Sequence, residues 1–123
     1  MYERILVGTD GSNTAAMAVD RAVEVASAFG STLTIASAGR ADQAQKVVES
    51  EAARHASAGV KIETQVLAGD PASALVELAE SAGFDLLVVG NKGMTGASRF
   101  FLGSVPNKIS HHIHRALLIV RTT

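Results

Sequence analysis

Short apolar runs alternate along the chain with longer segments of helical periodicity. Runs of branched aliphatic residues that end at turn-forming residues predict buried strands. They lie at residues 5–7, 32–37, 85–89 and 117–120. A further segment alternates apolar and polar side chains, which is typical of a strand near a sheet edge with one face in water. It spans residues 60–67. Apolar residues at helical spacing predict helices at residues 14–29, 41–58, 71–82 and 104–114.

Because strands and helices alternate, the sequence predicts an α/β fold. We expect a single domain over residues 1–123, with an open, parallel five-stranded sheet and helices on both of its faces, in a Rossmann-like arrangement. Ligands of such sheets bind beyond the carboxyl ends of the strands, where the strand order reverses. We therefore expect the ends of the first and fourth strands, at Thr9-Asp10 and at Gly90, to meet at that edge.

Capping residues mark several of the predicted helix ends. Ser12 or Asn13 is suited to cap the start of the first helix, and Gly30 is suited to end it. Asp70 followed by Pro71 is typical of an N-cap and a first helical residue. These residues place the beginning of the first and third helices directly after strands.

The composition, with 47% hydrophobic and 19% charged residues, is typical of a globular protein. The formal net charge is −1 and the basic residues are scattered, so we expect no nucleic-acid partner. The absence of cysteine excludes disulfides, thiol catalysis and cysteine-based metal sites. No apolar run approaches the ~20 residues that span a bilayer. Residues 1–4 show no signal-peptide pattern, so we expect a cytoplasmic protein without a membrane partner.

Glycines with an unusual spacing follow the fourth predicted strand, in the pattern Gly90-x2-Gly93-x9-Gly103-Ser104. Glycine lets backbone N–H groups approach a ligand closely. A helix that begins at Ser104 would direct its unpaired N–H groups and its positive dipole end to the same place. The segment therefore predicts a phosphate site built mostly from backbone. Lys92 lies inside the loop, where it either pairs with phosphate or is simply solvated.

Four segments together resemble the universal stress protein family. They are the glycine motif, Gly8-Thr9-Asp10-Gly11-Ser12, Gly69-Asp70-Pro71 and Asp85-Leu86-Leu87-Val88-Val89-Gly90. The resemblance covers nearly the whole chain and is strongest to single-domain actinobacterial members, some of which bind cyclic AMP. It implies a fold like that of the adenine nucleotide alpha hydrolases. It also implies an ATP-binding regulatory module of the stress response, with cyclic AMP as the alternative ligand.

The resemblance assigns an adenosine site to the ends of the first two strands. Asp10 would accept hydrogen bonds from the ribose. The backbone of Gly8, Thr9 and Ser37 would line the adenine. The stretch between Ser37 and Val60 is shorter than in usual members, so we expect a more open site on that side.

The resemblance assigns the phosphates to the glycine motif. Gly90 and Gly93 would pass under the sugar and phosphates. Gly103, Ser104 and Val105 would donate N–H groups to the phosphates, and Ser104 its hydroxyl as well. A Mg²⁺ ion is expected only as a companion of the phosphates.

The last predicted strand, residues 117–120, bears on oligomeric state. If it forms a sheet edge, its unpaired backbone groups need a partner or a cover. Members of the family that the chain resembles commonly pair this strand across a two-fold axis. We therefore expect a homodimer.

Other functions fit the residues less well. A slow ATPase or phosphotransferase is the main enzymatic alternative, but the Walker pattern and a second catalytic acid are missing. A flavin carrier is disfavoured by the absence of Trp and the single Tyr, and a nucleotide-free interaction protein by the intact glycine motif. His111, His112 and His114 suggest a metal site, but without cysteine or a nearby carboxylate we favour solvated side chains.

Overall fold

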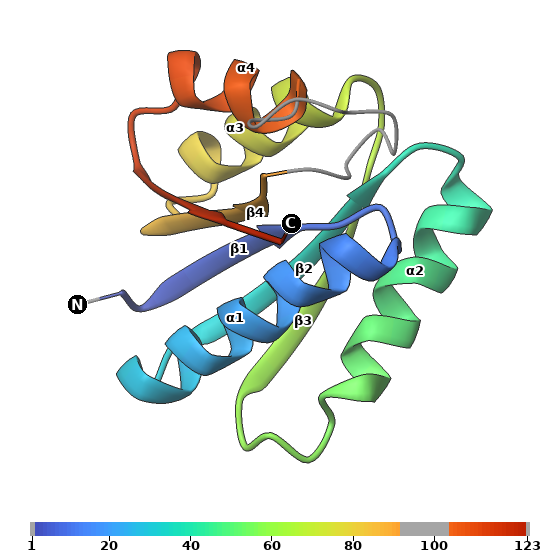
Figure 1. Ribbon diagram of the computed structural model, residues 1–123, viewed down its shortest axis with the longest axis vertical. Coiled ribbons are helices and arrows are strands. Elements are labelled where there is room, and N and C mark those ends of the chain that lie inside the picture. The colour runs from blue at the N-terminus through green and yellow to red at the C-terminus, as the bar shows by residue number, and fades with distance from the viewer. Residues whose placement is uncertain (1, 92–103, 123) are drawn as a thin grey trace.

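The computed structural model describes residues 2–91 and 104–122, and it has the predicted α/β architecture. The strands are β1 (Arg4–Gly8), β2 (Thr32–Ala38), β3 (Lys61–Leu67), β4 (Leu86–Gly90) and β5 (Ala116–Val120). The helices are α1 (Asn13–Phe29), α2 (Ala41–Arg54), α3 (Pro71–Ser81) and α4 (Ser104–His112). One sheet lies between two helical layers, with α1 and α2 on one face and α3 and α4 on the other (Figure 1).

All the strands are parallel, and their order across the sheet is β3-β2-β1-β4-β5. The order reverses between β1 and β4, where Val7 lies opposite Val88. The strand predicted to lie near an edge, β3, is an edge strand, and the exposed side chains of Lys61 and Glu63 explain its alternating pattern. The other edge strand is β5.

The core consists of two apolar clusters, one on each face of the sheet. On one face Ile5 of β1 packs in a cluster with α1 and with Val48 of α2. On the other face Leu6 packs in a cluster with Leu75 of α3 and Ile109 of α4. Successive residues of a strand point to opposite faces, so a strand that is covered on both sides needs an unbroken apolar run.

Three predicted helix ends are confirmed by their caps. The Ser12 hydroxyl accepts a hydrogen bond from the N–H of Ala15 at 3.2 Å. Gly30 ends α1 with a φ of 67°. The Asp70 carboxylate accepts a hydrogen bond from the N–H of Ser73 at 3.0 Å at the start of α3. These caps place the ends of β1 and β3 directly before helices.

Two helices, α2 and α4, end earlier than predicted, and side chains of neighbouring helices contact the residues that follow them. After α2, the His55 ring lies 2.9 Å from the Asp20 carboxylate of α1. After α4, the N–H of His114 donates to the Glu80 carboxylate of α3 at 2.8 Å. No helix in the described part of the chain is long and apolar enough to cross a membrane.

Candidate functional site

The carboxyl ends of β1, β2 and β4 meet at one edge of the sheet, as predicted. Just beyond β1, the N–H of Thr9 donates to the carbonyl of Ala36 in β2 at 3.0 Å. Just beyond β4, the N–H of Asn91 donates to the carbonyl of Val120 in β5 at 2.8 Å. Since the strand order reverses between β1 and β4, this edge has the geometry at which open α/β sheets bind ligands.

Asp10 lies in a hydrogen-bonded turn between β1 and α1. Its Oδ1 accepts the N–H of Ser12 at 2.9 Å, and the Thr9 hydroxyl accepts the N–H of Gly11 at 3.1 Å. In the described residues, no hydrogen bond reaches Oδ2 of Asp10, whose side chain is partly exposed. The turn therefore holds a carboxylate at the edge with one oxygen available to a ligand.

The other predicted residues on the adenine side are buried. Thr9 is completely buried, and Ser37 in β2 is 2% exposed, so their contact with an adenine ring stays a prediction. A Cβ on Gly8 would lie 2.6 Å from Cδ1 of Leu75 in α3. Glycine at this position therefore lets α3 pack closely on β1, and the contact of Gly8 with a ligand stays a prediction.

One side of the Asp10 turn is covered by α2. Gly11 has a φ of +83°, and a Cβ there would lie 2.9 Å from Cγ2 of Val47. A hollow of about 200 Å³ beside this contact is lined by Gly11, Lys46, Val47, Ser50 and Glu51. The short segment after Ser37 thus still packs a helix against the turn, and Lys46 is a cation near this edge that the sequence analysis missed.

The beginning and end of the glycine motif lie at the same edge. Gly90 ends β4 opposite Val120, and α4 begins at Ser104 as predicted. Val105, in the first turn of α4, is 5% exposed and belongs to the core cluster that α3 and α4 form with the sheet. The predicted site residues Lys92, Gly93 and Gly103 lie outside the described residues.

An ion pair joins the start of α3 to Lys108 of α4. The Lys108 ammonium donates to Oδ2 of Asp70 at 3.0 Å, and the Ser73 hydroxyl donates to the same oxygen at 2.9 Å. The backbone N–H of Ser73 and the Lys108 ammonium lower the pKa of Asp70 to about 2, so this carboxylate stays ionised. The sequence analysis treated Asp70 only as a helix cap and did not single out Lys108.

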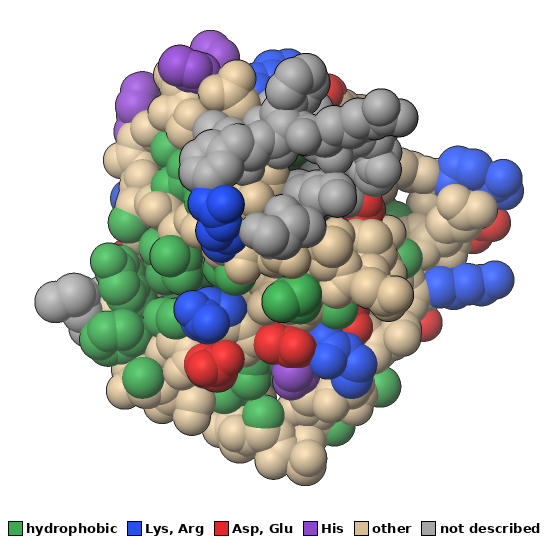
Figure 2. Space-filling view, in the orientation of Figure 1, with side chains coloured by type: hydrophobic (Ala, Val, Ile, Leu, Met, Phe, Trp, Pro, Cys, Tyr) green, Lys and Arg blue, Asp and Glu red, His purple; other side chains and the backbone are tan. Residues whose placement is uncertain are grey.

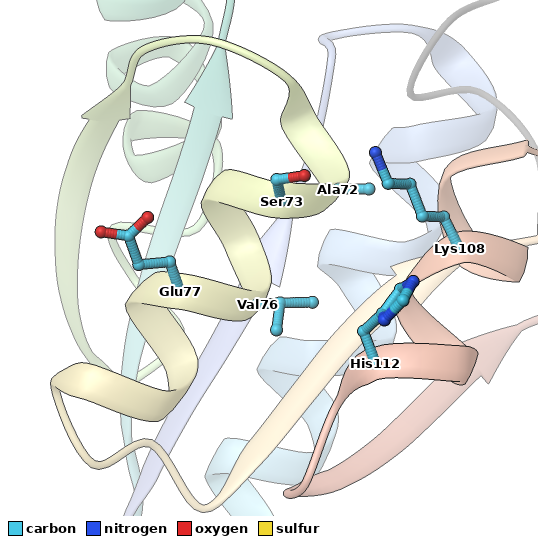
Figure 3. Close-up of a pocket in the computed structure, with 6 residues that line it drawn as sticks. All are labelled: Ala72, Ser73, Val76, Glu77, Lys108 and His112. Atoms are coloured by element: carbon cyan, nitrogen blue, oxygen red, sulfur yellow. The ribbon is translucent and has the colours of Figure 1, made fainter.

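A hollow of about 350 Å³ lies between α3 and α4 next to this ion pair. It is lined by Ala72, Ser73, Val76, Glu77, Lys108 and His112. In Figure 3 the Lys108 side chain extends from α4 along the beginning of α3, whereas Glu77 points away from it. Two polar groups of the hollow, on Ser73 and Lys108, are therefore already engaged by Asp70.

The histidines of the C-terminal region lie at the end of α4, and His112 also lines the hollow beside Lys108. His111, His112 and His114 are exposed, and Figure 2 shows histidine side chains gathered over the end of α4. Across residues 2–91 and 104–122, no three histidine or acidic side chains are grouped so that they could hold a metal ion. Near this edge the described residues therefore offer backbone groups, the carboxylates of Asp10 and Asp70, and the ammonium groups of Lys46 and Lys108.

Comparison with known proteins identifies relatives over the whole chain. The model of the universal stress protein family matches residues 1–43 and 36–121, two segments that meet in the stretch after Ser37. Universal stress protein Rv1636 of Mycobacterium tuberculosis strain H37Rv is 36% identical over 144 aligned residues, which cover 99% of this chain and 98% of that protein. Universal stress protein YxiE of Bacillus subtilis strain 168 is 30% identical, covering 98% of this chain and all of its own.

Solved structures give the same result. A universal stress protein crystallised in complex with cAMP is 40% identical, with a TM-score of 0.84 and coverage of 99% of this chain and 98% of its own. A universal stress protein family protein of Arabidopsis thaliana with AMP bound has a TM-score of 0.77 at 16% identity, covering 98% of this chain and 92% of its own. At that identity the second likeness concerns the fold alone.

Proposed function

The chain belongs to the universal stress protein family, and from this membership we propose that it binds an adenine nucleotide where β1 and β4 end. The observation that carries the proposal is the meeting of Asp10 and Gly90 at the reversal of strand order. One residue supplies a carboxylate and the other begins the glycine motif that leads to α4. An adenosine and its phosphates need these two kinds of group side by side.

The adenosine half of the site is centred on Asp10. Its Oδ2 is an acceptor without a partner in the described residues, which suits a ribose hydroxyl. The backbone groups of Gly8, Thr9 and Ser37, at the carboxyl ends of β1 and β2, would line the adenine edge. Recognition by backbone groups at this place requires no aromatic side chain, in keeping with the few aromatic residues of the sequence.

The phosphate half is centred on the start of α4. The unpaired N–H groups of the first turn, at Ser104 and Val105, and the positive end of the helix dipole favour an anion. Gly93 and Gly103 would add backbone N–H groups, and Lys92 a positive charge. A Mg²⁺ ion would be held mainly by the phosphates themselves.

The relatives support an adenine nucleotide but leave two candidates for this chain. The structure that is 40% identical was solved in complex with cAMP. The glycine motif of this chain, with its long spacing before Gly103, instead favours ATP, which has more phosphate to bind. We take ATP as the first candidate and cyclic AMP as the second.

Calorimetric titration of the purified protein with ATP, AMP, cyclic AMP and GTP tests the proposal. We expect saturable binding of at least one adenine nucleotide and much weaker binding of GTP. Mass spectrometry of any ligand released from the denatured protein would identify which adenine nucleotide is carried. Absence of binding for all three adenine nucleotides would contradict the proposed function.

We further propose that β5 pairs with a second copy of the chain. The half-buried residues Leu117, Leu118 and Ile119 lie on an edge strand that contains no charged residue. The opposite edge strand, β3, has exposed charged side chains, which are typical of an edge that stays unpaired. The contrast favours β5 as the interface.

A further inference from the structure

Asp70 and Lys108 join the start of α3 to α4, one helical turn after the proposed phosphate site at Ser104. Asp70 caps α3, and the Lys108 ammonium of α4 donates to its Oδ2 at 3.0 Å. Figure 3 shows the long Lys108 side chain directed along α3 toward the end where Ala72 and Ser73 lie. The ammonium group is therefore held at the beginning of α3.

The position of Lys108 in α4 directs it toward the same N–H groups that the phosphates would bind. It follows Ser104 by one helical turn, and residues four apart lie on the same face of a helix. Side chains of a helix also point back toward its N-terminus. Lys108 thus adds a mobile positive charge to the fixed positive end of α4.

We propose that Lys108 moves from Asp70 to the terminal phosphates of a bound nucleotide, and so favours ATP over cyclic AMP. This inference rests on the proposed nucleotide site. A polyphosphate chain extends charge beyond the first phosphate, whereas a cyclic monophosphate holds its only phosphate against the ribose. Lys108 therefore selects for the length of the phosphate chain.

The hydrogen bonds of Asp70 make this exchange feasible. Its Oδ2 accepts the N–H and the hydroxyl of Ser73 besides the Lys108 ammonium, so the cap of α3 persists when Lys108 leaves. The side chains of Lys108 and Asp70 are 49% and 52% exposed, and ion pairs of this kind are weak in water. The polyphosphate of ATP carries several negative charges against the single charge of the Asp70 carboxylate, so it attracts the ammonium group more strongly.

Asp70 also provides a constant competitor for the ammonium group. Because its pKa is lowered to about 2, it remains a carboxylate at any pH at which a cell operates. Lys108 could exchange Asp70 for a phosphate, or the ion pair could serve only to hold α4 against α3 as a structural clamp. These two roles therefore predict different results when Asp70 is neutralised. Exchange predicts tighter ATP binding, since the competitor is gone, whereas clamping predicts weaker binding of every nucleotide.

The first test is Lys108→Gln, with titration of ATP and cyclic AMP. We expect the affinity for ATP to fall roughly tenfold, the range for one charge-assisted hydrogen bond, with little change for cyclic AMP. The matched control is Lys61→Gln, which removes the same charge from the first residue of β3. This residue lies at the amino ends of the parallel strands, opposite to the end at which the nucleotide would bind. The control should bind both nucleotides as the unaltered protein does.

The second test is Asp70→Asn, which keeps a good N-cap but removes the competing charge. We expect ATP to bind roughly two- to fivefold more tightly. In the double variant Asp70→Asn/Lys108→Gln this gain should vanish. Weaker binding of both nucleotides in each single variant, or unchanged ATP affinity in Lys108→Gln, would overturn the exchange and leave the site itself standing. If the unaltered protein bound no adenine nucleotide, the proposed function would fail first.

Discussion

Thr122 donates two hydrogen bonds to Oδ1 of Asn91, from its backbone N–H at 2.8 Å and from its hydroxyl at 3.0 Å. Asn91 is 5% exposed and immediately follows Gly90, at the point where the chain leaves β4. The side chain therefore ties the start of the glycine motif to the segment that follows β5. Asn91 occupies the first of the two variable positions between Gly90 and Gly93, and it thus has a defined structural role.

Replacing Asn91 with alanine should destabilise the protein. The Asn91→Ala variant removes both part-buried hydrogen bonds of Thr122, each contributing about 0.5–1.5 kcal/mol, so the free energy of unfolding should fall by about 1–3 kcal/mol. Thr122→Val removes only the hydroxyl bond and should cost less, about 0.5–1.5 kcal/mol. Urea denaturation of both variants measures these values. Equal costs for the two variants would show that the backbone hydrogen bond contributes nothing.

Asp10 offers a way to separate the turn from the ligand contact. An Asn side chain at this position can still accept a hydrogen bond from the Ser12 N–H. The free energy of unfolding of Asp10→Asn should therefore lie within about 0.5 kcal/mol of that of the unaltered protein. Its affinity for ATP should fall by roughly 1–3 kcal/mol, because the ribose loses a charge-assisted hydrogen bond. Calorimetry and urea denaturation on the same samples test both statements. Full ATP affinity in this variant would remove Asp10 from the site.

The sequence predicted the architecture well because the sheet is parallel and covered on both faces. Strands buried on both sides require unbroken apolar runs, and these are visible without any knowledge of packing. The edge strand β3 was predictable from its alternating pattern, because polar side chains on it are exposed to water. Helix ends were harder, since α2 and α4 end where Asp20 and Glu80 of other helices bind the following residues.

The candidate site likewise has one part that follows from strand order and another that depends on tertiary packing. The placement of Asp10 and Gly90 at one edge was predictable because strand order alone brings the ends of β1 and β4 together. The pair Asp70–Lys108 joins residues 38 positions apart, and Asn91–Thr122 joins residues 31 apart. Contacts of this kind depend on how helices and loops pack, which no local pattern of residues records.

Asp85 should make stability depend on acidic pH. Its Oδ2 accepts the N–H groups of Arg4 and Glu3, both at 2.9 Å, and these bonds lower the pKa of its carboxyl. A lowered pKa in the folded state means stabilisation that is complete well above the unfolded value of about 3.9 and is lost as the pH falls through the folded value.

The Asp85→Asn variant tests this dependence. Urea denaturation from pH 7 down to about pH 2 should give a shallower loss of stability for the variant than for the unaltered protein. At pH 7 the variant should be less stable, because the N–H groups at the start of β1 lose a charged acceptor. Parallel curves for the two proteins over the acidic range would exclude this role of Asp85.

The proposed dimer can be tested with one substitution on each edge of the sheet. Leu118 of β5 and Ile62 of β3 are both half-buried and pack against the same core cluster, so a lysine at either position disturbs the core in a similar way. Only Leu118→Lys places a charge in the proposed interface. Light scattering should give a dimer for the unaltered protein and for Ile62→Lys, and a monomer for Leu118→Lys, with circular dichroism confirming that both variants fold. A monomeric unaltered protein at working concentration would refute the pairing of β5, and dissociation of Ile62→Lys alone would move the interface to β3.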